Sequence, residues 1–164
     1  MLGRTYDHQI CSASRALELV GERWSLLILR NAAFAGHTRF GEFQKSLELA
    51  PNILAARLAY FVETGLMTTA KGPDGHETYH LTKKGLDFVP VLVALTEWGD
   101  RWAAPDGPPI AYEHADCGGR VRHELVCRTC GERVRNEDVT ARKTAVMRRL
   151  QALRRPRAAS GRSR

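Results

Sequence analysis

The stretch that decides the fold is "APNILAARLAYFVETGLMTTAKGPDGHETYHLT", at positions 50–82. In its first part the apolar residues recur at the spacing of a helix, and Gly65 is a residue of the kind that commonly ends one. Beyond Gly65 the period changes, because 66–72 and 77–81 are short segments rich in Thr and Tyr that suit strands. Pro73, Asp74 and Gly75 between them are typical of a turn. The stretch therefore predicts a helix followed by a two-stranded hairpin. One stripe of the helix is apolar: Leu54, Leu58, Phe61 and Val62.

The flanking sequence predicts further helices on both sides. Upstream they cover 12–24, with Ser12 or Ser14 as the N-cap and Gly21 as a stop, then 26–36 capped by Ser25, then 38–47. Downstream, Thr82 caps one long helix through Trp102, with Pro90 near its first turns, where a missing N–H costs least. This order predicts a mainly α fold with a small β-hairpin wing, a winged helix-turn-helix.

Composition divides the 164 residues into four parts. Residues 8–103 form the folded domain, and the Pro- and Gly-rich 104–112 is a linker. A Cys/His segment, 113–139, resembles a zinc ribbon, and 140–164 is a basic helix followed by a disordered tail. Nine of the 25 basic residues and no acidic one lie from Arg142 onward, so the formal net charge of +7 belongs to this tail. Net charge by itself therefore does not predict DNA binding.

No apolar run reaches the ~18 residues of a membrane span, and the first residues lack the apolar core of a secretory signal. We expect a cytoplasmic protein with reduced thiols and no membrane partner. No phosphate loop, Ser/His/Asp constellation or paired carboxylates indicate an enzyme.

Four stretches resemble the HxlR family of bacterial winged-helix transcriptional regulators, relatives of the MarR group. They are "CSASRALELVGERWSLLILRNAAFAGHTRFGEF", "LAARLAYFVETGLM", "YHLTKKG" and "PVLVALTEWGDRW", and they cover roughly Cys11 to Trp102. The resemblance implies a homodimer that binds double-stranded DNA at a pseudo-palindromic operator, with two recognition helices in successive major grooves. It also implies a transcriptional regulator, more often a repressor, that responds to a small-molecule effector or to thiol modification.

The long helix carries an apolar stripe that would be a large patch on a monomer. Burying this stripe against a second copy is the simplest use for it, and packing on its own domain is the alternative. The stripe consists of Phe88, Leu92, Leu95, Trp98 and Trp102.

The helix over 50–65 is the expected recognition helix, and its apolar stripe fixes which face is outward. Asparagine can pair with adenine, alanine can touch a thymine methyl, and arginine reads guanine or binds phosphate. Asn52 can instead cap its helix. Because the face is mostly alanine, sequence preference also depends on DNA shape. The outward and flanking residues are Asn52, Ala55, Ala56, Arg57, Ala59 and Tyr60.

Arg39 and the hairpin supply further expected contacts. In the family, the position of Arg39 suits a phosphate contact, although this residue can instead pair with Glu42. Lys71 and His76 flank the hairpin tip and can approach the minor groove or its phosphates, and Asp74 opposes close contact there.

Cys11 lies where the family carries a cysteine at the start of its first helix, and in some members that thiol senses quinones, aldehydes or oxidants. A helix N-terminus lowers a thiol pKa, which favours the reactive thiolate. The alternative is a small buried apolar residue.

The stretch "HADCGGRVRHELVCRTCG", positions 114–131, contains two pairs of His or Cys residues. The members of each pair are separated by two residues, and each pair is followed by glycine. Two such pairs predict a closed tetrahedral structural Zn²⁺ site of the Cys3His type. A redox pair of Cys127 and Cys130, and a metal-free loop, remain alternatives, and His123 is a rival ligand. The predicted ligands are His114, Cys117, Cys127 and Cys130.

These features predict a dimeric sequence-specific transcriptional regulator. The alternative function is a zinc-ribbon interaction module that binds a protein or RNA partner. The basic end adds salt-dependent attraction to phosphate, or is a solvated tail without a role.

Overall fold

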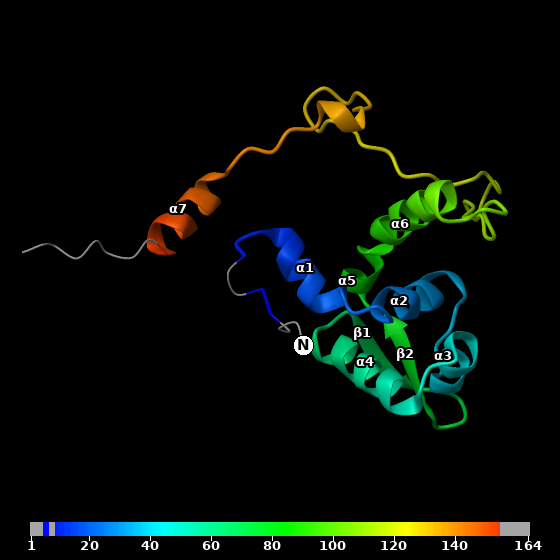
Figure 1. Cartoon of the computed structure of the whole chain (residues 1–164). Helices are drawn as coiled ribbons and strands as arrows, with labels where there is room; N and C mark the ends of the chain where they lie inside the picture. The colour runs from blue at the N-terminus through cyan, green and yellow to red at the C-terminus, as the bar shows by residue number, and fades with distance from the viewer. Residues whose placement is uncertain (1–4, 7–8, 155–164) are drawn as a thin grey trace, which may run out of the picture.

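The computed structural model describes residues 5–6 and 9–154 (Figure 1). The expected domain start at residue 8 and the tail beyond residue 154 lie outside these ranges. The elements are α1 (Ser12–Val20), α2 (Ser25–Phe34), α3 (Phe40–Leu47), α4 (Pro51–Glu63), β1 (Met67–Lys71), β2 (Glu77–Leu81), α5 (Lys83–Leu86), α6 (Val89–Trp102), the 3₁₀ turn η1 (Asn136–Asp138) and α7 (Ala145–Arg154). The predicted winged helix-turn-helix is confirmed in its element order.

Local chemistry fixes both ends of α4. Pro51 is its first residue, where the missing N–H loses no hydrogen bond. At the other end Gly65 has a φ of 71°, a left-handed conformation that favours glycine. Two backbone bonds close this end: Leu66 donates to Phe61 O at 2.8 Å and Gly65 donates to Val62 O at 3.1 Å. The predicted stop at Gly65 is therefore confirmed.

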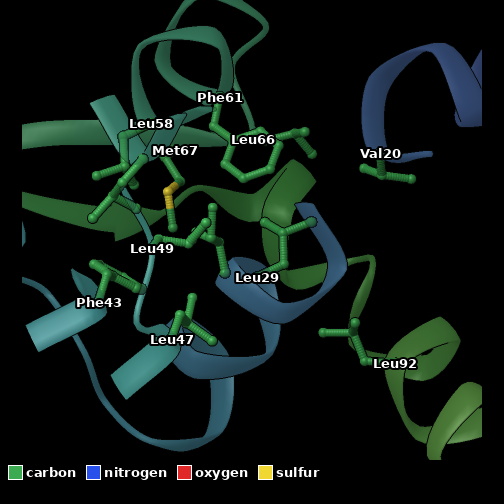
Figure 2. Close-up of a cluster of buried hydrophobic side chains, with 12 residues drawn as sticks. Val20, Leu29, Phe43, Leu47, Leu49, Leu58, Phe61, Leu66, Met67 and Leu92 are labelled. Carbon is green, nitrogen blue, oxygen red and sulfur yellow. The ribbon is translucent and has the colours of Figure 1, made fainter. Parts of the chain in front are cut away.

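The core lies between α4, the hairpin and the first three helices. Side chains from α1, α2, α3, α4, β1 and α6 converge there (Figure 2). Phe43 of α3 is fully buried, as are Leu54, Leu58 and Phe61 of the predicted stripe of α4, whereas Val62 of that stripe is 36% exposed. Because α3 and α4 share this core, the outward face of α4 is held in a fixed orientation.

The hairpin forms the wing. β1 and β2 pair antiparallel in a register that places Met67 opposite Leu81 and Lys71 opposite Glu77. Gly75, with φ 79°, makes the turn possible, and Gly72 donates to His76 O at 2.8 Å. Tyr79 donates from its backbone N–H to Thr38 O at 2.7 Å, which ties β2 to the segment preceding α3. The wing therefore packs beside the helix-turn-helix.

Three expectations about caps and continuity were wrong. Cys11, rather than Ser12 or Ser14, is the N-cap of α1, and Ser25 lies inside α2 after an N-cap at Trp24. The helix expected from Thr82 to Trp102 is split into α5 and α6. Thr82 does cap α5, but a Cβ at Gly85 would lie 2.3 Å from Leu66 O, so the chain passes very close to the start of β1 there. Pro90 then lies in the first turn of α6.

Candidate DNA-binding surface and cysteine sites

The outward face of α4 consists of small, uncharged side chains over most of its length, and the exposed Glu63 lies at its C-terminal end. Asn52, Ala55, Ala56 and Ala59 are exposed, and they lie opposite the buried Leu54, Leu58 and Phe61. The cap of α4 is Ala50, and Asn52 is in the first helical turn, so the alternative that Asn52 caps the helix is wrong. This face can approach closely the floor of a major groove, because it carries no bulky side chain at its centre.

Arg57 and Tyr60 lie at the edge of this face, toward α1. Arg57 Nε is 3.7 Å from Glu22 Oε2, and its guanidinium lies 5.9 Å from the centre of the Tyr60 ring. The Tyr60 hydroxyl donates to Glu18 O at 3.1 Å. Tyr60 therefore connects α4 to α1, and Arg57 connects α4 to the segment between α1 and α2, which the sequence pattern did not reveal.

Arg39 joins the start of α3 to the wing. Its guanidinium forms an ion pair with Asp74 at the hairpin tip, and both side chains are about two fifths exposed. The alternative pairing of Arg39 with Glu42 is made through the backbone and not through the guanidinium: the Glu42 carboxylate accepts the backbone N–H groups of Thr38 and Arg39 at 2.8 and 2.9 Å. The hydrogen bond with Asp74 raises the pKa of Arg39 and lowers that of Asp74. The two backbone N–H groups likewise lower the pKa of Glu42.

A concave surface of about 730 Å³ lies between α3 and the wing. It is lined on one side by Arg39 and Lys45 and on the other by His76, while Lys71 is exposed at the end of β1. Sequence analysis missed Lys45, although its position between the buried Phe43 and Leu47 already placed it on the outer side of α3. Arg39, Lys45 and His76 thus converge at one edge of the helix-turn-helix, together with the carboxylates of Glu42 and Glu77.

Cys11 is exposed and caps α1, so the alternative of a buried apolar cysteine is wrong. Its Sγ accepts the backbone N–H of Ser14 at 3.4 Å, and the two side chains are 3.5 Å apart. The Ser14 side chain first, and the backbone N–H groups of Ser14 and Ala13 after it, lower the pKa of the Cys11 thiol. This arrangement favours the thiolate at a helix N-terminus.

A groove of about 1000 Å³ opens beside Cys11, between α1 and α7. Its walls combine apolar and cationic side chains. They include Ile10, Arg15, Arg142, Lys143, Met147 and Leu150. No pattern in the sequence indicates that the basic C-terminal helix lines a groove with Cys11.

The Cys/His segment forms two knuckles, which we define as 112–121 and 125–134. His114 Nδ1 lies 3.3 Å from Cys117 Sγ in the first. In the second, the backbone N–H groups of Cys130 and Thr129 lower the pKa of Cys127. Among the described residues, no three His, Cys, Asp or Glu side chains are close enough to hold a metal ion. Within one chain, His114 thus lies near Cys117 and Cys127 lies near Cys130, but the four predicted ligands do not come together at one site.

The apolar stripe of the expected dimer interface divides in two. Leu92 belongs to the protomer's own core and Phe88 packs against it, so these two residues correct the expectation of a fully exposed stripe. Leu95, Trp98 and Trp102 remain 47, 62 and 69% exposed. The uncovered part of the stripe therefore lies in the second half of α6.

None of the helices within residues 5–6 and 9–154 is long and apolar enough to cross a membrane.

Comparisons with known proteins agree with this architecture. The profile of the HxlR-like helix-turn-helix family matches residues 19–107. The chain is 44% identical over 133 residues to Rv3095 of Mycobacterium tuberculosis, an HTH-type transcriptional regulator that is itself uncharacterised; this covers 79% of the chain and 83% of the relative. The crystal structure of PA1607, a candidate transcription factor, superposes with a TM-score of 0.75 and 41% identity, covering 85% of this chain and 99% of that one.

A second solved structure, the candidate transcription factor PA1374 of Pseudomonas aeruginosa, has a TM-score of 0.59 and 36% identity over 85% of this chain and 99% of its own. The family match spans α2, α3, α4, the wing, α5 and α6, which include the elements that build the α4 and wing surface described above. The chain belongs to the HxlR family of helix-turn-helix transcriptional regulators.

Proposed function

We propose that this protein is a homodimeric, sequence-specific repressor that binds a pseudo-palindromic duplex through α4 and the wing. The observation that carries the proposal is the exposed, small face of α4, held rigidly by a fully buried stripe on its other side. A helix presented in this way enters a major groove, which is wide enough to admit it.

The expected contacts follow from where each side chain lies. Asn52 reaches an adenine edge, and the methyl groups of Ala55, Ala56 and Ala59 meet thymine methyls or sugar carbons. Lys71 and His76 approach phosphates along the wing, and Arg39 does so once Asp74 releases it. Few hydrogen bonds to bases are available on this face, so part of the sequence selectivity comes from DNA shape.

The dimer is supported by the uncovered half of α6. Trp98 and Trp102 are large, neighbouring on one helical face, and more than half exposed, which is unusual for a monomer in water. Covering this face with the same face of a second copy is an isologous contact of the kind that makes two-fold dimers. Such a dimer presents two α4 helices to two half-sites.

The regulatory signal acts at Cys11 and the groove beside it. An exposed thiol whose pKa is lowered reacts more readily with electrophiles at neutral pH, and the basic and apolar walls suit a small ligand with an acidic and an apolar part. Modification of Cys11, or a ligand in the groove, would move α1 and change the half-site spacing of the dimer. Membership of the family favours the regulator over an interaction module for protein or RNA.

The test is selection of duplexes from a random library, followed by affinity measurements at about 0.15 M salt, where specific binding persists. Ala56→Glu places a negative charge at the centre of the α4 face and should abolish selective binding. Ala13→Glu makes the same change on the exposed side of α1 and should retain it. Binding that shows no sequence preference, and that disappears when residues 142–164 are removed, would assign all affinity to the basic end and refute the proposal.

A further inference from the structure

The two knuckles are structural copies of one another, thirteen residues apart. In the first, His114 donates to Gly119 O and Gly118 donates to His114 O, both at 2.8 Å. In the second, Cys127 donates to Glu132 O and Gly131 donates to Cys127 O, both at 2.9 Å. Gly118 and Gly131 have φ values of 67° and 75°, which a residue with a Cβ rarely adopts.

The repetition continues outside the turns. Val121 donates to Tyr112 O and Val134 donates to Leu125 O, each at 2.8 Å. The bridges Glu113–Arg120 and Val126–Arg133 also correspond. Each knuckle is therefore a complete small hairpin whose turn presents two ligand side chains three residues apart.

Each knuckle supplies half of a tetrahedral metal site. Zn²⁺ in structural sites takes four ligands from thiolates and imidazoles, typically as two pairs separated by two residues. The pair in the first knuckle is His114 and Cys117, and the pair in the second is Cys127 and Cys130. Three thiolates and one imidazole are soft enough to prefer zinc to magnesium or calcium.

Contacts with the folded domain anchor the first knuckle and the segment that joins it to the second. The first is anchored by Tyr112, whose ring stacks on Phe34 at 4.0 Å and whose hydroxyl lies 3.3 Å from Thr96 Oγ1. Between the knuckles, the backbone N–H of His123 donates to Glu97 Oε2 at 3.0 Å. Figure 1 shows the first knuckle beside the end of α6 and the second in the separate loop that carries η1. The described residues of one chain accordingly gather no three ligands.

The anchors Thr96 and Glu97 belong to α6, the helix that carries the exposed Leu95, Trp98 and Trp102 on another face. A second copy that covers the exposed face therefore packs on the same helix that holds the first knuckle. In a two-fold symmetric dimer each contact occurs twice. The first knuckle of each copy can therefore meet the second knuckle of the other copy.

We propose that the protein binds zinc between two copies of the chain, with His114 and Cys117 of one copy and Cys127 and Cys130 of the other as ligands. Each dimer then holds two equivalent structural sites. The zinc ions fasten the C-terminal segments of the two chains to each other across α6, and thiolate ligation releases protons on binding. This inference rests on the homodimer of the proposed function, and not on its DNA-binding step.

Mixed dimers test the proposal. One chain carries His114→Ala and Cys117→Ser, the other carries Cys127→Ser and Cys130→Ser, and two different tags isolate the dimer that contains both. Zinc is counted by native mass spectrometry and by elemental analysis. We expect two zinc ions per wild-type dimer, none in the dimer of either variant with itself, and one in the mixed dimer. Cys11→Ser is the matched control and should keep both.

Other results are equally decisive. A mixed dimer without zinc, beside a wild-type dimer with two, would place each site within one chain and overturn the proposal. A wild-type dimer without zinc would overturn the metal site itself. DNA binding by the same samples separates the two proposals, because a zinc-free dimer that still selects its duplex leaves the proposed function intact. A wild-type monomer would overturn the shared site and the dimer together.

Discussion

Replacing Asp74 by Asn should strengthen DNA binding through Arg39. The Asp74 carboxylate holds the Arg39 guanidinium at the edge of the helix-turn-helix, and it places a negative charge where phosphates approach. Asn keeps an oxygen that accepts the His76 backbone N–H, at 3.2 Å in the structure, so the hairpin turn is preserved. The change therefore frees one arginine in each protomer without altering the fold.

The magnitude follows from counterion release. Each new phosphate contact steepens the plot of log affinity against log salt by about 0.9, so a dimer that gains two contacts steepens it by about 1.8. Between about 0.05 and about 0.2 M salt, the advantage of the variant should shrink about tenfold, because a fourfold change in salt acts through a slope of about 1.8. Fluorescence anisotropy with a selected duplex at several salt concentrations measures this slope.

Two variants isolate the cause. Asp87→Asn removes the same charge from an exposed pair with Lys83, 3.3 Å away on α5, and should leave the slope near the wild-type value. Arg39→Ala should weaken binding, and adding Asp74→Asn to it should have little further effect. An unchanged slope in Asp74→Asn, or the same gain in the Arg39→Ala background, would refute the argument that Asp74 acts by occupying Arg39.

Three further predictions concern the thiol, the packing and the interface. Because hydrogen bonds from Ser14 lower the pKa of Cys11, Ser14→Ala should shift the pH profile of Cys11 alkylation, followed by mass spectrometry, to higher pH; an unshifted profile would remove Ser14 as the cause. Gly85→Ala places a Cβ 2.3 Å from a carbonyl oxygen and should destabilise the fold by about 1–3 kcal/mol in a denaturant titration. Gly41→Ala, whose Cβ meets nothing within 4 Å, should cost no stability, and equal losses in both would contradict the steric reason. Trp98→Ala should raise the concentration at which sedimentation detects monomer, and an unchanged dimer would place the interface elsewhere.

The helix-turn-helix could be predicted from sequence because its signals are local. Leu54, Leu58 and Phe61 recur at helical spacing, so burying one fixes the burial of the others and the outward direction of Ala55 and Ala56. Gly65 and Gly75 occupy positions where φ is positive, and only a few residues separate them from the elements that they end. Such patterns depend only on residues that are close together along the chain, and the sequence lists all of these residues.

Continuity and caps were less predictable. The apolar stripe of the predicted long helix is unbroken in sequence, but the helix is split between Leu86 and Val89, just after Gly85 passes close to the start of β1. Leu92 is in the core and Trp98 is exposed, although both belong to the same stripe. The choice depends on where α6 crosses the rest of the domain, and helical period contains no information about that crossing.

By itself, the sequence determined the order of helices and hairpin, the buried positions Leu54, Leu58 and Phe61 of α4, and the pairing of His114 with Cys117 and of Cys127 with Cys130. Only the tertiary structure decided that Arg39 pairs with Asp74, thirty-five residues away, that Tyr60 contacts α1, and that the first knuckle lies beside α6 while the second lies in a separate loop. The physical reason is that backbone geometry and helical period act over a few residues. Contacts between distant segments are set instead by how whole elements pack, which no local pattern records.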